Sequence, residues 1–126
     1  MSSTLISEPL SAERLYNMDQ LKDLAAGNKE FLVSLASIFL KTIPSNSTDL
    51  VLAASSGNWD MTHKLAHKLK STIDSMNIVS IKTDIRILEL DAKNKKNLDS
   101  LLGLSTKVNA VIQKVAQQVQ VDYNLS

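Results

Sequence analysis

The chain has 126 residues, a formal net charge of +1 and no cysteine. This length suffices for one domain with a single sizeable core, and the near-neutral net charge gives no electrostatic argument for binding nucleic acid. The lack of cysteine excludes disulfide bonds and thiolate chemistry and suits a reducing compartment. Hydrophobic residues make up 44% of the chain, with only three glycines and two prolines. Because few residues break helices or favour strands, the composition predicts an all-α domain.

No long apolar run occurs near the first residue, and the first basic residue is Arg14. The sequence therefore predicts neither a secretory leader nor a membrane-spanning helix. We expect a cytoplasmic protein that contacts neither nucleic acid nor a membrane.

Two Gly-Asn pairs divide the chain into helical segments. Gly27 precedes Asn28, and Gly57 precedes Asn58. Glycine tolerates the left-handed conformation that ends a helix, and an asparagine side chain can cap the helix that follows. We therefore predict a tight helix-to-helix joint at each pair.

Apolar residues recur at helical spacing between and after these joints. We predict a short helix over residues 18–26, a long segment between the joints, a helix over residues 59–76, a helix capped by Ser80, a polar turn over residues 91–97, and a last helix from Leu98 to Val119. The stripe of the long segment comprises Phe31, Leu32, Leu35, Ile38, Phe39, Ile43, Leu50, Leu52, Ala53 and Ala54. Proline lacks an N–H and disfavours helix at the preceding residue, so Pro44 predicts a kink or a restart.

Four substantial amphipathic helices with short connections predict an antiparallel four-helix bundle, with the short additional N-terminal helix covering one end. The bundle would span residues 18–121. It would follow a loose arm over residues 1–17, with one helical turn around residues 12–16, and precede a tail over residues 122–126. We expect a monomer. Homo-oligomerisation through the leucine and valine stripe of the last helix is an alternative, but a core role explains that stripe more simply.

The stretch KLAHKLKSTIDSMNI places His67 on the helix over residues 59–76. At about 100° per residue, His67 falls about 140° from the centre of the apolar arc of that helix, so it should face water. The arc comprises Leu65, Ala66, Leu69, Ile73 and Met76. The side chains expected around the imidazole are those of His63, Lys64, Lys68, Lys70, Ser71 and Asp74.

An exposed imidazole beside lysines is suited to carrying a phosphoryl group. Neutral imidazole is a nucleophile near neutral pH, and nearby ammonium groups both disfavour imidazolium and stabilise the added negative charge. The small side chain of Ser71 leaves room for another protein to bring its own acidic site close to His67.

Spacing and composition alone leave other interpretations open. A solvent-facing histidine is most often an ordinary surface residue. His63 and His67 could share a metal ion, but such sites need three or four ligands and only carboxylates such as Asp60 or Asp74 remain, so we predict no metal site. No arrangement indicates a Ser-His-Asp triad, and no glycine-rich loop predicts ATP binding.

The run LAHKLKS, residues 65–71, resembles the signature of histidine-containing phosphotransfer (HPt) domains. In that signature the phosphorylated histidine is followed by a hydrophobic residue two positions on, a lysine three on and a small residue, commonly glycine, four on. His67, Leu69, Lys70 and Ser71 fill these places. The likeness includes YNMDQLKDLAAGNKEFLVSLASIFLKTIP and GNWDMTHKLAHKLK and covers roughly residues 16–121. It departs from the family at Ser71 and at DSMNI, where many members have another glycine.

The resemblance implies a relay role without autonomous kinase activity. His67 would accept a phosphoryl group from an aspartyl phosphate on a receiver domain and pass it to another receiver, of a response regulator or a hybrid histidine kinase. No cofactor is expected here, because Mg²⁺ belongs to the receiver. Lys70 and Lys68 would give electrostatic support, and the docking surface would include His63, Lys64, Ser71 and Asp74. Ser71 should alter selectivity or rate rather than abolish transfer.

Two alternatives accompany this interpretation. The chain could be a helical interaction module that docks on a receiver or another protein without phosphoryl transfer. His63 is the competing phosphoryl acceptor, although it lies nearer the apolar arc and should pack partly on the flank of the helix.

Overall fold

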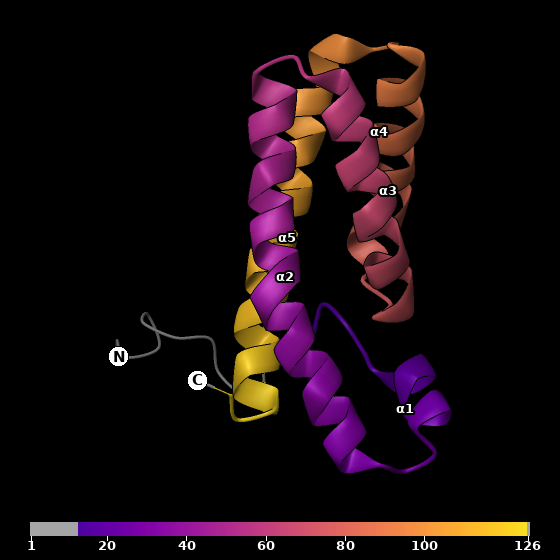
Figure 1. Cartoon of the computed structure of the whole chain (residues 1–126), viewed down its shortest axis with the longest axis vertical. Coiled ribbons are helices and arrows are strands. Elements are labelled where there is room, and N and C mark those ends of the chain that lie inside the picture. Colours follow the sequence, from indigo (N-terminus) through magenta and orange to yellow (C-terminus); the bar gives the residue numbers. More distant parts are fainter. Residues whose placement is uncertain (1–12, 126) are drawn as a thin grey trace.

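The computed structural model describes residues 13–125, and within that range the chain is all-helical, as predicted (Figure 1). The helices are α1 (Asp19–Ala25), α2 (Lys29–Ser55), α3 (Trp59–Ser75), α4 (Lys82–Asn94) and α5 (Leu98–Asp122), with a 3₁₀ turn, η2 (Val79–Ile81), before α4. None of the helices in the described range is long and apolar enough to cross a membrane.

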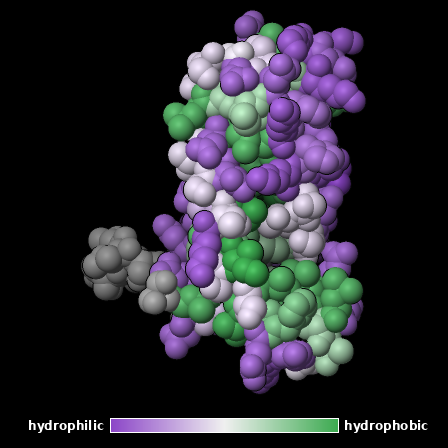
Figure 2. Space-filling view, viewed as in Figure 1, coloured by the Kyte–Doolittle hydropathy of each residue, from purple (hydrophilic) through white to green (hydrophobic). Residues whose placement is uncertain are grey.

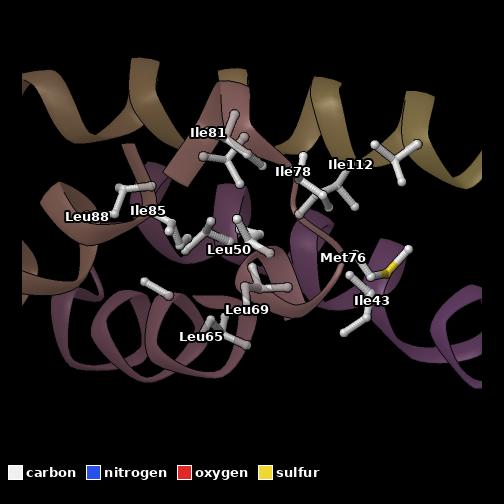
Figure 3. Close-up of a cluster of buried hydrophobic side chains, with 14 of the residues drawn as sticks. Ile43, Leu50, Leu65, Leu69, Met76, Ile78, Ile81, Ile85, Leu88 and Ile112 are labelled. Atoms are coloured by element: carbon white, nitrogen blue, oxygen red, sulfur yellow. The ribbon is translucent and has the colours of Figure 1, made fainter. Parts of the chain in front are cut away.

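The four longer helices pack in a closed ring, because α2 and α4 each contact both α3 and α5. Successive helices run in opposite directions, and α1 lies at the lower end of the molecule beside α2 (Figure 1). Aliphatic side chains from α2, α3, α4 and α5 fill the interior (Figure 3). The predicted apolar arc of α3 is confirmed, since all five of its residues are buried. Complete burial of one such aliphatic side chain contributes about 1.5–3 kcal/mol, which fixes the rotation of α3 about its axis.

The stripe predicted for α2 is only partly buried. Phe31, Ile38 and Leu52 remain 44%, 57% and 60% exposed, whereas the other members are buried or half-buried. The ten residues span more of the helix circumference than the neighbouring helices cover. These three side chains therefore form part of the surface.

Both Gly-Asn joints have the predicted geometry. Gly27 and Gly57 adopt φ values of 84° and 73°, in the left-handed region that glycine enters at little cost. The side chains of Asn28 and Asn58 each accept a hydrogen bond from a backbone N–H in the first turn of the following helix, at 3.0 and 3.2 Å. The chain thus reverses direction at each joint with a satisfied helix start.

Pro44 does not restart the helix, because α2 is continuous from Lys29 to Ser55 and bends along its length (Figure 1). The Pro44 carbonyl accepts hydrogen bonds from Gln113 Nε2 of α5 at 3.0 Å and from Thr48 Oγ1 at 3.1 Å. The α2 helix therefore passes through Pro44 as a bent helix, which agrees with the predicted kink and not with a restart.

Two other predicted boundaries are wrong. Ser80 lies inside η2 and no side chain caps α4, because burial of Ile78 and Ile81 draws this turn onto the core. The polar turn is also shorter than residues 91–97, since α4 continues to Asn94 and keeps Ala92 buried.

The N-terminal arm is not loose over its last residues. Tyr16 is buried, and the Asn17 N–H donates to the carbonyl of Met76 at 2.9 Å. The predicted helical turn is absent from residues 13–16, and the rest of that prediction lies outside the described residues. At the other end, the predicted tail begins within α5, and Tyr123 packs against the core.

Candidate functional site

His67 lies on the middle of α3 with 68% of its side chain exposed, as predicted. The apolar arc on the opposite side of α3 anchors the helix in the core. The imidazole is therefore presented to solvent on a helix that is anchored in the core.

Glu89 of α4 connects His67 to Lys70. One carboxylate oxygen lies 2.5 Å from His67 Nδ1, and the other lies 2.7 Å from Lys70 Nζ. The Glu89 side chain is only 17% exposed, because it lies in the contact between α3 and α4. Sequence analysis missed this residue. Its only signal was a position next to the core residue Leu88, which does not identify the helix that Glu89 faces.

The electrostatic environment keeps Glu89 ionised. The hydrogen bond from Lys70 is the main reason that the pKa of Glu89 lies below its ordinary value; partial burial opposes this effect and the hydrogen bond from His67 adds to it. An ionised carboxylate only accepts hydrogen bonds. His67 Nδ1 must therefore carry the proton that it donates to Glu89.

This hydrogen bond selects the reactive nitrogen of His67. In a neutral imidazole with its proton on Nδ1, the lone pair resides on Nε2. The ring thus directs a nucleophilic nitrogen away from Glu89. Sequence analysis expected the nearby lysines to be the main influence on the imidazole, but Lys70 instead neutralises the carboxylate that orients the ring.

His63 occupies the flank of α3, as predicted, and is half-buried. Its Nδ1 donates to the backbone carbonyl of Glu89 at 3.0 Å, and its ring centroid lies 6.5 Å from that of His67. Both histidines therefore bond to the same residue of α4. The more exposed His67 is the better placed to react with another protein.

The remaining predicted site residues fall into two groups. Lys64, Lys68 and Ser71 are exposed on α3, and neither lysine forms an ion pair with another described residue. Asp74 instead turns toward α4, where its Oδ2 lies 2.7 Å from Arg86. The docking surface expected at Asp74 therefore presents an ion pair rather than an isolated carboxylate.

Metal ligands do not gather in the part of the chain that the structure describes. No group of three or more His, Asp or Glu side chains between residues 13 and 125 could hold a metal ion.

An apolar groove lies between α1, α2 and the C-terminal half of α3, where Thr72, Ser75 and Met76 follow His67 by five to nine positions. Its volume is about 170 Å³, and it is lined by Leu21, Leu35, Ile38, Phe39, Thr42, Ile43, Thr72, Ser75 and Met76. Figure 2 shows apolar side chains gathered over α1 and the adjoining part of α2. Sequence analysis missed the groove because it assigned Ile38 to the core.

Comparison of the chain with models of known protein families, with curated proteins and with solved structures gave no match in any of the three.

Proposed function

We propose that this protein is a histidine phosphotransfer domain, in which His67 relays a phosphoryl group between aspartates of receiver domains. The observation that supports this most strongly is the hydrogen bond between His67 Nδ1 and Glu89, which leaves the lone pair on Nε2 of a side chain that is 68% exposed. The ring of contacts among α2, α3, α4 and α5 supports an antiparallel four-helix bundle with α1 as the additional helix. The relay would operate in the cytoplasm.

The first transfer begins with attack of the His67 Nε2 lone pair on the phosphorus of an aspartyl phosphate. The N–P bond forms, the bond from phosphorus to the aspartyl oxygen breaks, and the receiver carboxylate leaves. The ring keeps its Nδ1 proton, so the product is positively charged at the imidazole. Glu89 offsets that charge across the hydrogen bond.

The second transfer reverses these bond changes on another receiver. A receiver carboxylate attacks the phosphorus, the N–P bond breaks, and its electron pair returns to Nε2. No proton leaves His67 at either step, because Nδ1–H remains bonded to Glu89. The protein is thus a carrier rather than a kinase, and the Mg²⁺ and catalytic carboxylates would belong to the receiver.

The surrounding lysines divide into two roles. Lys70 forms an ion pair with Glu89, so it acts on His67 only through that carboxylate. Lys64 and Lys68 are exposed and could approach the phosphoryl group or the acidic surface of a receiver. Receivers of response regulators or of a hybrid histidine kinase would dock over this face, with His63, Ser71 and the Asp74–Arg86 pair contributing to the surface.

The proposal is tested by phosphoryl transfer from a panel of phosphorylated receiver domains, followed by intact mass at neutral pH. We expect an acid-labile gain of one phosphoryl group that is lost in His67→Gln and retained in His63→Gln. Circular dichroism and receiver binding of His67→Gln serve as controls for the fold and the docking surface. Transfer that survives in His67→Gln would contradict the assignment.

The groove between α1, α2 and α3 supports one alternative, a helical module that binds a partner without phosphoryl chemistry. Two variants distinguish this alternative from the relay. Such a module would lose binding in Ile38→Asn, which places a polar side chain on the groove, and would be indifferent to His67→Gln. Phosphoryl gain on the wild-type protein would reject it.

A further inference from the structure

We infer that residues 13–18 form a strap that is fastened to the C-terminal end of α5 and thereby holds α1 in place beside the groove. The inference concerns how α1 is held and does not depend on the proposed relay function.

The strap is fastened at Asp122, the last residue of α5. The Arg14 guanidinium donates to both carboxylate oxygens, at 2.8 and 2.5 Å, and the Tyr16 hydroxyl donates to one of them at 2.5 Å. Gln118, one turn earlier, accepts from the N–H of Leu15 at 2.9 Å and donates to the carbonyl of Glu13 at 3.1 Å. Two α5 side chains therefore bind both the side chains and the backbone of the strap.

The position of Asp122 indicates that its carboxylate serves the strap and not the helix. The C-terminus of a helix carries partial negative charge, so a carboxylate in its last turn is unfavourable. The α5 helix has no basic residue in that turn to compensate. Arg14 and Tyr16, from the other end of the chain, provide the compensation.

Beyond Tyr16 the strap leads directly into α1. Asn17 bonds to the carbonyl that ends α3, and Met18 is buried immediately before α1 begins. These contacts fix the N-terminal end of α1, and the joint at Gly27 and Asn28 fixes its C-terminal end.

The α1 helix depends on these attachments. It has seven residues, too few for a stable isolated helix, and Ala25 is its only buried side chain. Leu21 of α1 nevertheless forms one wall of the groove. Release of the strap should therefore free α1 and open the groove on one side, while the packed helices α2–α5 keep their own core.

The test is hydrogen exchange of Asp122→Asn, with Tyr16→Phe as a second variant that keeps the buried ring. Asp99→Asn is the matched control, because it removes the same charge from the first turn of α5. We expect the protection of the α1 amides to fall about tenfold in Asp122→Asn, with α3 and α4 unchanged, and to fall less in Tyr16→Phe. Asp99→Asn should leave α1 unchanged.

Unchanged protection in α1 would overturn the inference, and so would an equal loss in every helix. If the strap made no contribution, Asp122→Asn would instead stabilise α5 by removing an unfavourable charge from its end. Phosphorylation of His67 by the small donor phosphoramidate should not change in Asp122→Asn, since it requires no docking. If phosphoramidate does not modify His67 even in the wild type, the proposed function fails. The hydrogen-exchange result would still show whether the strap holds α1 in place.

Discussion

At the scale of single residues, Glu89 accepts a hydrogen bond from Nδ1 of His67, which leaves the imidazole lone pair on Nε2. The exposure of His67 followed from the helical period, because the core arc of α3 left it on the opposite side. The hydrogen-bond partner of His67 could not be predicted from the helical period, because Glu89 lies 22 positions later and meets His67 only through the packing of α4 on α3. Periodicity predicts the face on which a residue lies but not the side chain that it will meet across a helix contact.

Two replacements of Glu89 distinguish the effect of its hydrogen bond on transfer from the effect of its charge. Glu89→Ala removes the acceptor that fixes the His67 tautomer, so receiver-dependent phosphorylation should slow by about 10-fold to 100-fold, the range expected for a bond to a charged group. Glu89→Gln keeps a carbonyl acceptor and should lose much less. The rate of phosphoryl transfer from one receiver at saturating concentration, measured by rapid quench, would test both variants. Equal rates in the two variants would show that Glu89 does not orient the imidazole.

At the scale of elements, the helices that carry strong local signals were predicted well. Each Gly-Asn joint combines a left-handed glycine with a capping asparagine, and both signals are local to the chain. Serine often caps a helix, but burial of the neighbouring Ile78 and Ile81 determines the backbone conformation at Ser80. At Pro44 the sequence left a kink and a restart open, and α2 continues with a bend. Local chemistry predicted an element where tertiary contacts did not oppose it.

Two glycine substitutions should change stability in opposite directions. Gly57 has φ of 73°, so Gly57→Ala should lower the free energy of unfolding by about 1–2 kcal/mol through backbone strain. Gly103 lies inside α5 with nothing within 4 Å of an added Cβ, so Gly103→Ala should raise stability by about 0.5–1 kcal/mol. Urea denaturation at constant pH measures both changes. A stabilising Gly57→Ala would contradict the geometry of the joint.

At the scale of the whole molecule, the all-helical class followed from composition and periodicity. The attachment of residues 13–18 to α5 did not, because Arg14 and Asp122 are 108 positions apart and neither belongs to a motif. The groove was also unpredictable, since an exposed Ile38 and a buried one have the same helical spacing. Contacts between distant segments therefore account for most of what sequence analysis missed.

Exposed lysines should make receiver association depend on salt. The double variant Lys64→Gln, Lys68→Gln removes two positive charges from the proposed docking face and should slow association and flatten its dependence on ionic strength. Lys114→Gln is a control on α5, which packs on α2 and α4 rather than mainly on α3. Association rates measured from low to high salt would test this. An identical salt dependence in the wild type and the double variant would show that these lysines do not attract the receiver during association.

In the proposed relay, His67 reacts through Nε2 while Nδ1 stays bonded to Glu89. The most direct measurement is NMR of ¹⁵N-labelled protein after transfer from a phosphorylated receiver, using ³¹P coupling to identify the nitrogen that bears phosphorus. We expect phosphorus on Nε2 of His67 and a retained proton on Nδ1. Phosphorus on Nδ1 of His67, or on either nitrogen of His63, would contradict it.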